Sequence, residues 1–308
     1  MSSKFNITLT NYARGLSQDG TPSLATFLAP EVVVQSANGQ YKDFSDKNAF
    51  QNPDTRRAIG GPARRLEFEA EDPFFNCNPN ALEIAIDDHE RRQAGEGDPL
   101  GMEKAKTKTL ISGARVAHES KVFGAAAASL AAVAAMGAWG GETSTADPIA
   151  ELDALIEELA TQTGQMPNRL ALGLPAWRRI RHNPAVLKRF PGAAIVGVTL
   201  QQFASLLLNP QLDIRVGVMS ADTTKPGKTR NVVNIVGSEL YLFIAQASPS
   251  VYDPSFMKTF RTRGGGVDIV RIYRAETNRS DILAVDWTED IKVTSKVCAR
   301  RVTITDAS

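Results

Sequence analysis

The sequence of 308 residues predicts an α+β fold, and three features of its pattern indicate this class. Residues 98–123 have the pattern of one long helix. Residues 147–207 alternate helix and strand signals, as a compact α/β unit does. From Asp213 onward the chain consists of short apolar runs between turn residues, which predicts antiparallel strands.

Composition excludes several classes of protein. The hydrophobic content of 43% is enough for one large or two modest domains, and the net charge of +1 argues against a dedicated nucleic-acid binder. Cys77 and Cys298 lie far apart, which predicts two free thiols in a reducing compartment. Residues 1–10 lack a signal-peptide pattern, and the uncharged run 125–138 is too short to span a bilayer. We therefore expect a soluble intracellular protein.

The N-terminal residues 1–29 are predicted to form an extended arm. Polar and apolar residues are mixed there without a sustained period. Gly15, Gly20 and Pro22 interrupt any helix that could begin in this region.

Residues 30–80 are predicted to form an extended loop with a β-hairpin. Asn38-Gly39 follows the apolar run 32–34 and precedes two aromatic residues, and Asn-Gly between β-rich segments is a strong hairpin signal. Residues 66–71 alternate apolar and acidic side chains, which predicts a strand with one face of each kind. Because a two-stranded ribbon is marginally stable alone, its apolar face must pack against another surface, in this chain or in another copy.

Charges in this loop follow an order along the chain. Four arginines precede four acidic residues within residues 56–72. Two interpretations stay open: solvated loop charges, or basic and acidic ends that meet head-to-tail between copies and close into rings. The candidate inter-subunit contact residues are Arg56, Arg57, Arg64, Arg65, Leu66, Glu67, Phe68, Glu69 and Glu71.

A short helix is predicted at 81–92, and the long helix follows it. Asp98-Pro99 is an N-cap followed by proline at the first helical position, where its missing N–H costs nothing. A helix from there to Phe123 has about 25 residues and measures about 38 Å. The alanine-rich run after Phe123 is predicted to be a packed helix end.

Cap and stop signals place the remaining elements. Asp147-Pro148 repeats the cap-and-proline start, and Gly164 supplies a C-terminal stop. The next predicted elements are a strand at 169–174, a short helix with Trp177, a turn or two of helix at 185–190, and a helix capped by Thr199. The strands predicted beyond them are 214–219, 232–236, 240–245, 256–261, 267–273, 282–287 and 297–305.

Signals for catalysis are weak. Residues 222–229 nearly match a phosphate-binding P-loop, but Asp222 replaces the first glycine and the residues after Thr229 favour a strand, so we predict a strand-connecting loop. Residues 264–266, three glycines, are predicted to form a hinge or turn. The three histidines are scattered, and Asp87 and Glu90 are predicted to belong to a helix-surface charge cluster. We predict no catalytic, cofactor-binding or metal-binding residues, and no enzyme.

The order of these elements resembles the major capsid protein of tailed bacteriophages, which has the Hong Kong 97-type fold. The residues that carry the resemblance are the helix at 152–156, the strand at 167–173, the Trp-bearing helix at 175–177, and the segment 27–34 with 39–41. The resemblance implies five regions: N-terminal arm 1–29, extended β-hairpin loop 30–80, peripheral domain 81–146 with the spine helix, axial domain 147–266, and return strands 267–308 of the peripheral domain.

The resemblance also implies a function and partners. The chain would assemble as a homo-oligomer of hexamers and pentamers into an icosahedral shell around double-stranded DNA, without sequence specificity. Portal, scaffolding and decoration proteins would be further partners, and no membrane would be involved. The location would be the virion, after assembly in the host cytoplasm. Because no scaffold-like helical segment precedes the arm, scaffolding is expected from a separate protein or from a leader outside this sequence.

Three alternatives stay open. The first is an encapsulin-like nanocompartment, which has the same fold but packages enzymes. The second is an enzyme with a P-loop-like site at residues 222–229. The third is a tail-tube or head-completion protein, a class of usually shorter chains without the long helix.

Overall fold

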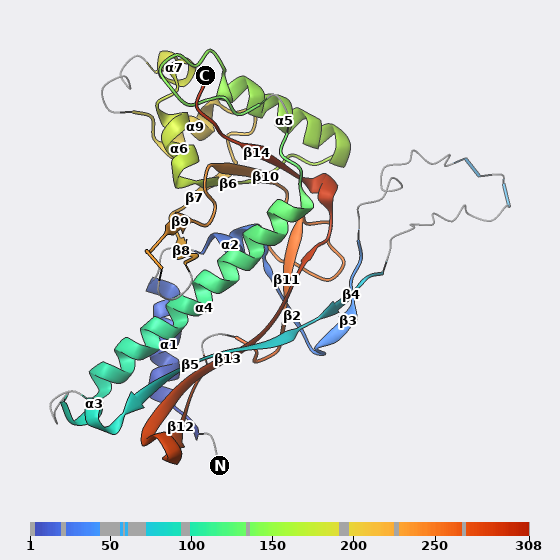
Figure 1. The fold of residues 1–308 in the computed structure, drawn as a ribbon. Coiled ribbons are helices and arrows are strands. Elements are labelled where there is room, and N and C mark those ends of the chain that lie inside the picture. Colours follow the sequence, from blue (N-terminus) through green and yellow to red (C-terminus); the bar gives the residue numbers. More distant parts are fainter. Residues whose placement is uncertain are drawn as a thin grey trace.

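The computed structural model describes most of the chain, and every structural statement below concerns the described residues. They are residues 4–19, 23–43, 56–57, 59–60, 72–93, 99–133, 136–190, 197–224, 228–266 and 269–307. The molecule is elongated, with one sheet and its helices toward each end and with the two chain termini at opposite ends (Figure 1). Helices and sheets both contribute, which confirms the predicted α+β class.

A six-stranded sheet forms the end near the N-terminus. Its strands are β1 (Lys4–Phe5), β2 (Glu31–Val34), β5 (Asn78–Asp87), β11 (Met257–Thr262), β12 (Val270–Ala275) and β13 (Ser280–Val293). The order is β1-β12-β13-β11-β2, and β5 also pairs with β13. All these pairs are antiparallel except β2 with β11, which is parallel. Strand β13, with 14 residues, is therefore the centre of this sheet.

A four-stranded sheet forms the other end. Its order is β14-β10-β6-β7, with β14 (Ala299–Thr303), β10 (Glu239–Phe243), β6 (Arg169–Gly173) and β7 (Asp213–Gly217). One face packs under α5 (Pro148–Thr163), α6 (Leu174–Arg181), α7 (Pro184–Lys188) and α9 (Leu200–Leu206). Alternate residues of the strands point to the two faces: Leu170 and Leu172 contact these helices, whereas Ala171 faces α2 (Leu24–Leu28) and the end of α4 (Pro99–Ser129).

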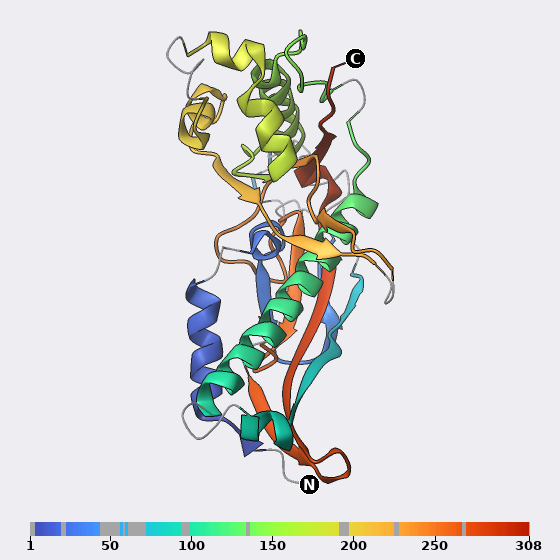
Figure 2. The same cartoon turned by 60° about the vertical axis from the view of Figure 1, so that its left-hand side comes forward.

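Helix α4 (Pro99–Ser129) connects the two ends. Its 31 residues give it a length of about 46 Å. The helix runs obliquely along the six-stranded sheet, with α1 (Ile7–Asp19) beside it (Figure 2). Ile111 and Ala114 are buried against the six-stranded sheet, and Phe123 and Ala126 are buried against the four-stranded sheet. One helix thus contributes to both cores.

An ionic cluster around a buried carboxylate fastens α4 to β13. The Glu289 carboxylate, 4% exposed, lies 2.7 Å from His118 Nδ1 and 2.7 Å from Lys121 Nζ. Lys121 also donates a hydrogen bond to Asn80 Oδ1 on β5, at 2.8 Å. Burial raises the pKa of Glu289, but the hydrogen bonds from His118 and Lys121 outweigh burial and hold the pKa at about 2.

Caps confirm several predicted helix boundaries. Asp147 accepts a hydrogen bond from Ile149 N at the start of α5, and Gly164 ends this helix with φ of 66°. Thr199 and Gln202 form a capping box at the start of α9. Helix α4 extends to Ser129, beyond the predicted end at Phe123, because its alanine-rich last turns pack under the four-stranded sheet.

The predicted extended arm is wrong for residues 7–19, which form α1. The side chain of Asn6 accepts a hydrogen bond from Leu9 N at 3.0 Å and so caps the helix start. Leu9 and Ala13, one turn apart, are buried against α4. This tertiary contact stabilises a helix that the glycine content disfavours.

The helix predicted at 81–92 is also wrong for most of its length. Residues 78–87 form β5, and only Asp88–Gln93 form a helix, α3. The apolar residues Leu82, Ile84 and Ile86 recur with period two and pack against the core beneath α4. Asp87 therefore ends a strand and does not share a helix with Glu90.

The predicted Asn-Gly hairpin is a third error. Asn38 and Gly39 lie inside strand β3 (Asn38–Gln40), which pairs with β4 (Phe74–Asn76), while β2 pairs with β11. A Cβ atom at Gly39 would lie 2.6 Å from Phe75 Cζ. The glycine thus allows a ring to approach the backbone and does not form a turn.

The sheets do not follow the predicted boundary at residue 267. Strand β11 precedes that residue and belongs to the six-stranded sheet, whereas β14 follows it and belongs to the four-stranded sheet. The remaining elements are the two-stranded sheet β8 (Ser220–Asp222) and β9 (Val232–Asn234), and the short helices η1 (Glu276–Asn278) and η2 (Lys296–Cys298). Cys77 and Cys298 are both buried and free, as predicted.

The β3–β4 ribbon is fixed to the body by aromatic stacking. The ring of Phe75 stacks on Phe260 of β11 with centroids 4.6 Å apart, and Tyr41 contacts the same ring at 5.5 Å. Phe74, which precedes Phe75 on β4, points to the opposite face of the ribbon and is 71% exposed. One face of the ribbon is therefore part of a core, and the other is solvated.

The Glu289 cluster predicts a specific dependence of stability on pH. The pKa of Glu289 is about 2 when folded and 4.5 ordinarily, so its contribution is fully present above about pH 4.5 and is lost as pH falls toward 2. The free energy of unfolding of the wild type should fall as the pH is lowered. We expect Glu289→Gln to reduce this fall by about 3 kcal/mol. Denaturation at several pH values measures this, with the exposed Glu142→Gln as control. Equal slopes for Glu289→Gln and the wild type would contradict the account.

The two neighbouring phenylalanines provide a matched test of the ribbon base. We expect Phe75→Ala to lower the free energy of unfolding by about 3 kcal/mol, because it leaves a cavity beside Phe260. Phe74→Ala should change it by no more than about 0.5 kcal/mol, because this side chain is exposed. Urea denaturation measures both values, and similar losses for the two variants would show that the ring stack does not hold the ribbon.

Candidate inter-subunit surfaces

The predicted contact loop lies between β3 and β4, and the structure describes its base and a few residues farther along. Arg56 and Arg57 are exposed, and Ile59 is fully exposed. The other candidates lie outside the described residues: Arg64, Arg65, Leu66, Glu67, Phe68, Glu69 and Glu71. At the base, Asp72 pairs with Lys42 at 2.5 Å, so this carboxylate has a partner within the chain.

Exposed apolar side chains are the physical feature of this loop. Phe74 at the base and Ile59 farther along have no apolar cover in the described part of the chain. The loop therefore presents apolar side chains and arginine charge at its surface. Its base is anchored to the body.

A second ribbon carries exposed valines that the sequence pattern did not single out. Val218 precedes β8, and Val232 and Val233 lie on β9; all three are between 43% and 48% exposed. Strands β8 and β9 pair only with each other in the described chain, through three residues each. In the sequence, two adjacent valines after a basic turn are equally typical of a buried strand. The pattern alone therefore does not indicate that these valines are exposed.

The P-loop-like segment is the turn of this second ribbon. Asp222 Oδ1 accepts a hydrogen bond from Thr224 N at 2.9 Å, and the hydrogen bonds with Thr224 lower the pKa of Asp222. This carboxylate thus occupies the turn as an anion, and the next element is strand β9. The prediction of a strand-connecting loop is confirmed.

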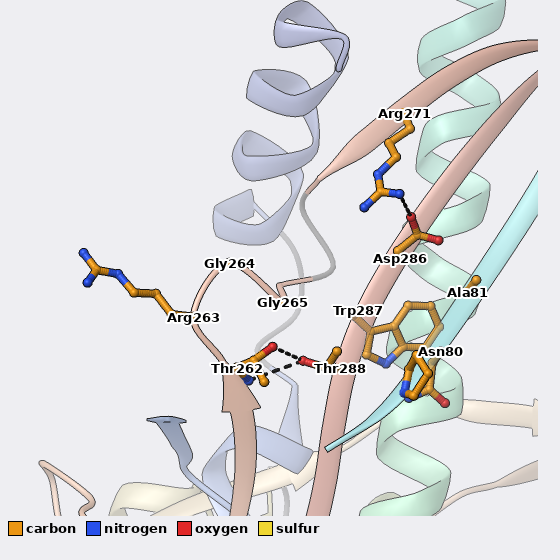
Figure 3. Close-up of a pocket in the computed structure, with 11 residues that line it drawn as sticks. Asn80, Ala81, Thr262, Arg263, Gly264, Gly265, Arg271, Asp286, Trp287 and Thr288 are labelled. Atoms are coloured by element: carbon orange, nitrogen blue, oxygen red, sulfur yellow. Dashed lines mark hydrogen bonds and ion pairs between the residues drawn. The ribbon is translucent and has the colours of Figure 1, made fainter. Parts of the chain in front are cut away.

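One pocket of about 510 Å³ lies where β13 meets the ends of β5 and β11 (Figure 3). Thr262 and Thr288 join their hydroxyls at 2.5 Å, and Arg271 pairs with Asp286 at 2.8 Å. Arg263 and Gly264 lie on the turn that leaves β11, where a turn was predicted. Arg271 and Asp286 pair with each other, and the described lining residues include no histidine or cysteine that could serve as a base or a thiol nucleophile.

The described residues offer neither a metal-binding cluster nor a membrane-spanning helix. No group of three or more His, Cys, Asp or Glu in the described stretches could hold a metal ion. No helix among the described residues is both long enough and apolar enough to cross a bilayer.

Comparison with known proteins gives a match in structure only. No family model matches the sequence, and no curated protein matches it either. A phage-related protein from Bordetella bronchiseptica RB50 superposes with a TM-score of 0.76 and 22% identity, over 100% of this chain and 98% of the other.

Two other solved structures are similar at lower scores. The subunit of the mature capsid of bacteriophage PhiM1 has a TM-score of 0.55 and 12% identity, over 93% of this chain and 88% of the other. The SrpI encapsulin of Synechococcus elongatus PCC 7942 has a TM-score of 0.54 and 9% identity, over 94% and 90%. The structural match covers nearly the whole chain in each case, so this protein has the Hong Kong 97-type fold of phage capsid proteins, which encapsulins share.

Proposed function

We propose that this chain is a non-enzymatic structural subunit that assembles with copies of itself into a closed shell. The observation that carries the proposal is an anchored loop whose apolar residues have no cover in the described part of the chain. Phe75 fixes the loop base to Phe260, while Phe74 and Ile59 stay in solvent. A neighbouring subunit would bury these groups, and the fold shared with phage capsids supports a neighbour of the same kind.

The finer proposal is a phage capsid of hexamers and pentamers around double-stranded DNA, located in the virion after assembly in the host cytoplasm. Its inter-subunit contacts would include the nine loop residues Arg56, Arg57, Arg64, Arg65, Leu66, Glu67, Phe68, Glu69 and Glu71. The net charge of +1 suits a container, because a strongly basic inner wall would bind DNA tightly and oppose its packing and release. Portal, scaffolding and decoration proteins are the further partners of such a shell.

A second candidate is an encapsulin-like compartment, which the match to the SrpI encapsulin supports. The two candidates differ in what the shell contains. Purified particles treated with nuclease should retain protected DNA if the chain is a capsid protein, and cargo protein without DNA if it is an encapsulin. Electron microscopy of the same sample tests the shell itself.

Loop docking predicts the effect of one substitution. Phe68→Asp should leave the subunit soluble and folded but prevent shell formation, because burying an unpaired carboxylate costs about 3–5 kcal/mol. Phe68→Leu is the matched control, since it keeps an apolar side chain at the same position, and it should still assemble. Electron microscopy counts the particles, and circular dichroism verifies the fold. Normal particles from Phe68→Asp would show that this face does not dock.

A further inference from the structure

The second ribbon, which we call the valine ribbon, comprises Val218, β8, β9 and the turn residues Lys228–Arg230. Val232 and Val233 are adjacent on β9, so their side chains point to opposite faces. Val232 is 44% exposed and Val233 is 43% exposed, so each face of the ribbon leaves part of a valine side chain in solvent. A two-stranded ribbon alone is marginally stable in water; this ribbon contacts α4 through β8, and its partly exposed valines leave apolar area for a further contact.

A complementary surface lies where α5 and α9 end, and we call it the α5–α9 patch. It comprises Asp153, Glu157, Met166 and Leu208. Met166 is 45% exposed and Leu208 is 53% exposed. Asp153 Oδ1 accepts a hydrogen bond from Leu208 N at 2.7 Å, and Asn209 Nδ2 donates to the carbonyl of Pro167, next to Met166, at 2.8 Å. These bonds hold the two apolar side chains beside the acidic face of α5.

The charges of the two surfaces are opposite. Lys228 and Arg230 are exposed on the turn of the valine ribbon, and the side chain of Arg230 is only loosely paired with Asp222, at 3.7 Å. On the patch, Asp153 and Glu157 are one helical turn apart, and Glu157 is exposed. Each surface thus combines apolar side chains with charge, basic on one and acidic on the other.

The two surfaces lie at opposite ends of one strand. Asp213 N at the start of β7 donates to the carbonyl of Asn168, close to the patch, whereas the valine ribbon follows directly after Gly217 at the end of β7. Five strand residues separate them by about 17 Å. The patch therefore cannot cover the ribbon of its own chain, but it can cover that of a neighbour placed head-to-tail.

We propose that the valine ribbon of one copy packs on the α5–α9 patch of the next copy. The contact is heterologous, so repetition around an axis closes a ring. Lys228 and Arg230 of one subunit face Glu157 and Asp153 of its neighbour, and Val233, on one face of the ribbon, covers Met166 and Leu208. This inference rests on the proposed function and adds a contact that does not involve the loop between β3 and β4.

Cysteine cross-linking of assembled particles tests the direction of the contact. The native Cys77 and Cys298 are buried, so new exposed thiols report on the surface. We expect Val233→Cys subunits and Leu208→Cys subunits, co-assembled and mildly oxidised, to give disulfide-linked dimers of one chain of each kind. Particles of either variant alone should give at least tenfold fewer linked dimers.

Charge exchange provides an independent readout. Arg230→Glu and Glu157→Arg are exposed substitutions, so each subunit should fold normally. Each alone should lower the yield of particles about tenfold at low salt, and the double variant should recover most of the yield. Linked dimers of Val233→Cys with itself, or wild-type yields from both single charge variants, would overturn this contact alone. A wild-type chain that never assembles would overturn the proposed function and this contact together.

Discussion

Residues 118–121 of helix α4 hold the two sheets in one body, and the rest of the structure depends on them. His118 and Lys121 bind the buried carboxylate of Glu289 in the six-stranded sheet. Between them, Glu119 accepts hydrogen bonds from Ser23 Oγ and Leu24 N at the start of α2, which covers the four-stranded sheet. Removing one partner at such a site leaves a buried charge without compensation. The arrangement of these side chains is therefore strongly specified.

The end of α4 is fixed in the same way. Arg301 of β14 donates hydrogen bonds to the carbonyls of Ala127 and Leu130, at 2.9 and 3.2 Å, and so satisfies groups that a helix C-terminus leaves free. Hydrogen bonds and ion pairs thus connect α4 to both sheets of the body. Ribbons that start from such a body are held at fixed places, which a subunit needs if several of its contacts are to form at once.

The features that were predicted correctly are those that interactions between residues close in the sequence determine. The cap at Asp147, the stop at Gly164 and the capping box at Thr199 were readable because each motif satisfies its own helix end. The pairing of β2 with β11 was not readable, because the partners lie more than two hundred residues apart and nothing near either strand encodes it. Helix α1 was missed for a related reason, since it is stabilised by packing against α4. Strand β5 has a local signal, the period-two apolar pattern of Leu82, Ile84 and Ile86, and the prediction of a helix there was a wrong assignment of the period. The α5–α9 patch has no sequence signal, because Leu208 and Asp153 meet only in the fold.

In the proposed shell, copies of this chain cover the apolar surface that one copy alone exposes. Sedimentation velocity of the wild-type protein over a wide range of concentrations, with electron microscopy of the fast fraction, measures this most directly. The account predicts a cooperative transition from subunits to closed particles as concentration rises. A single species with the mass of one chain at every concentration would contradict it.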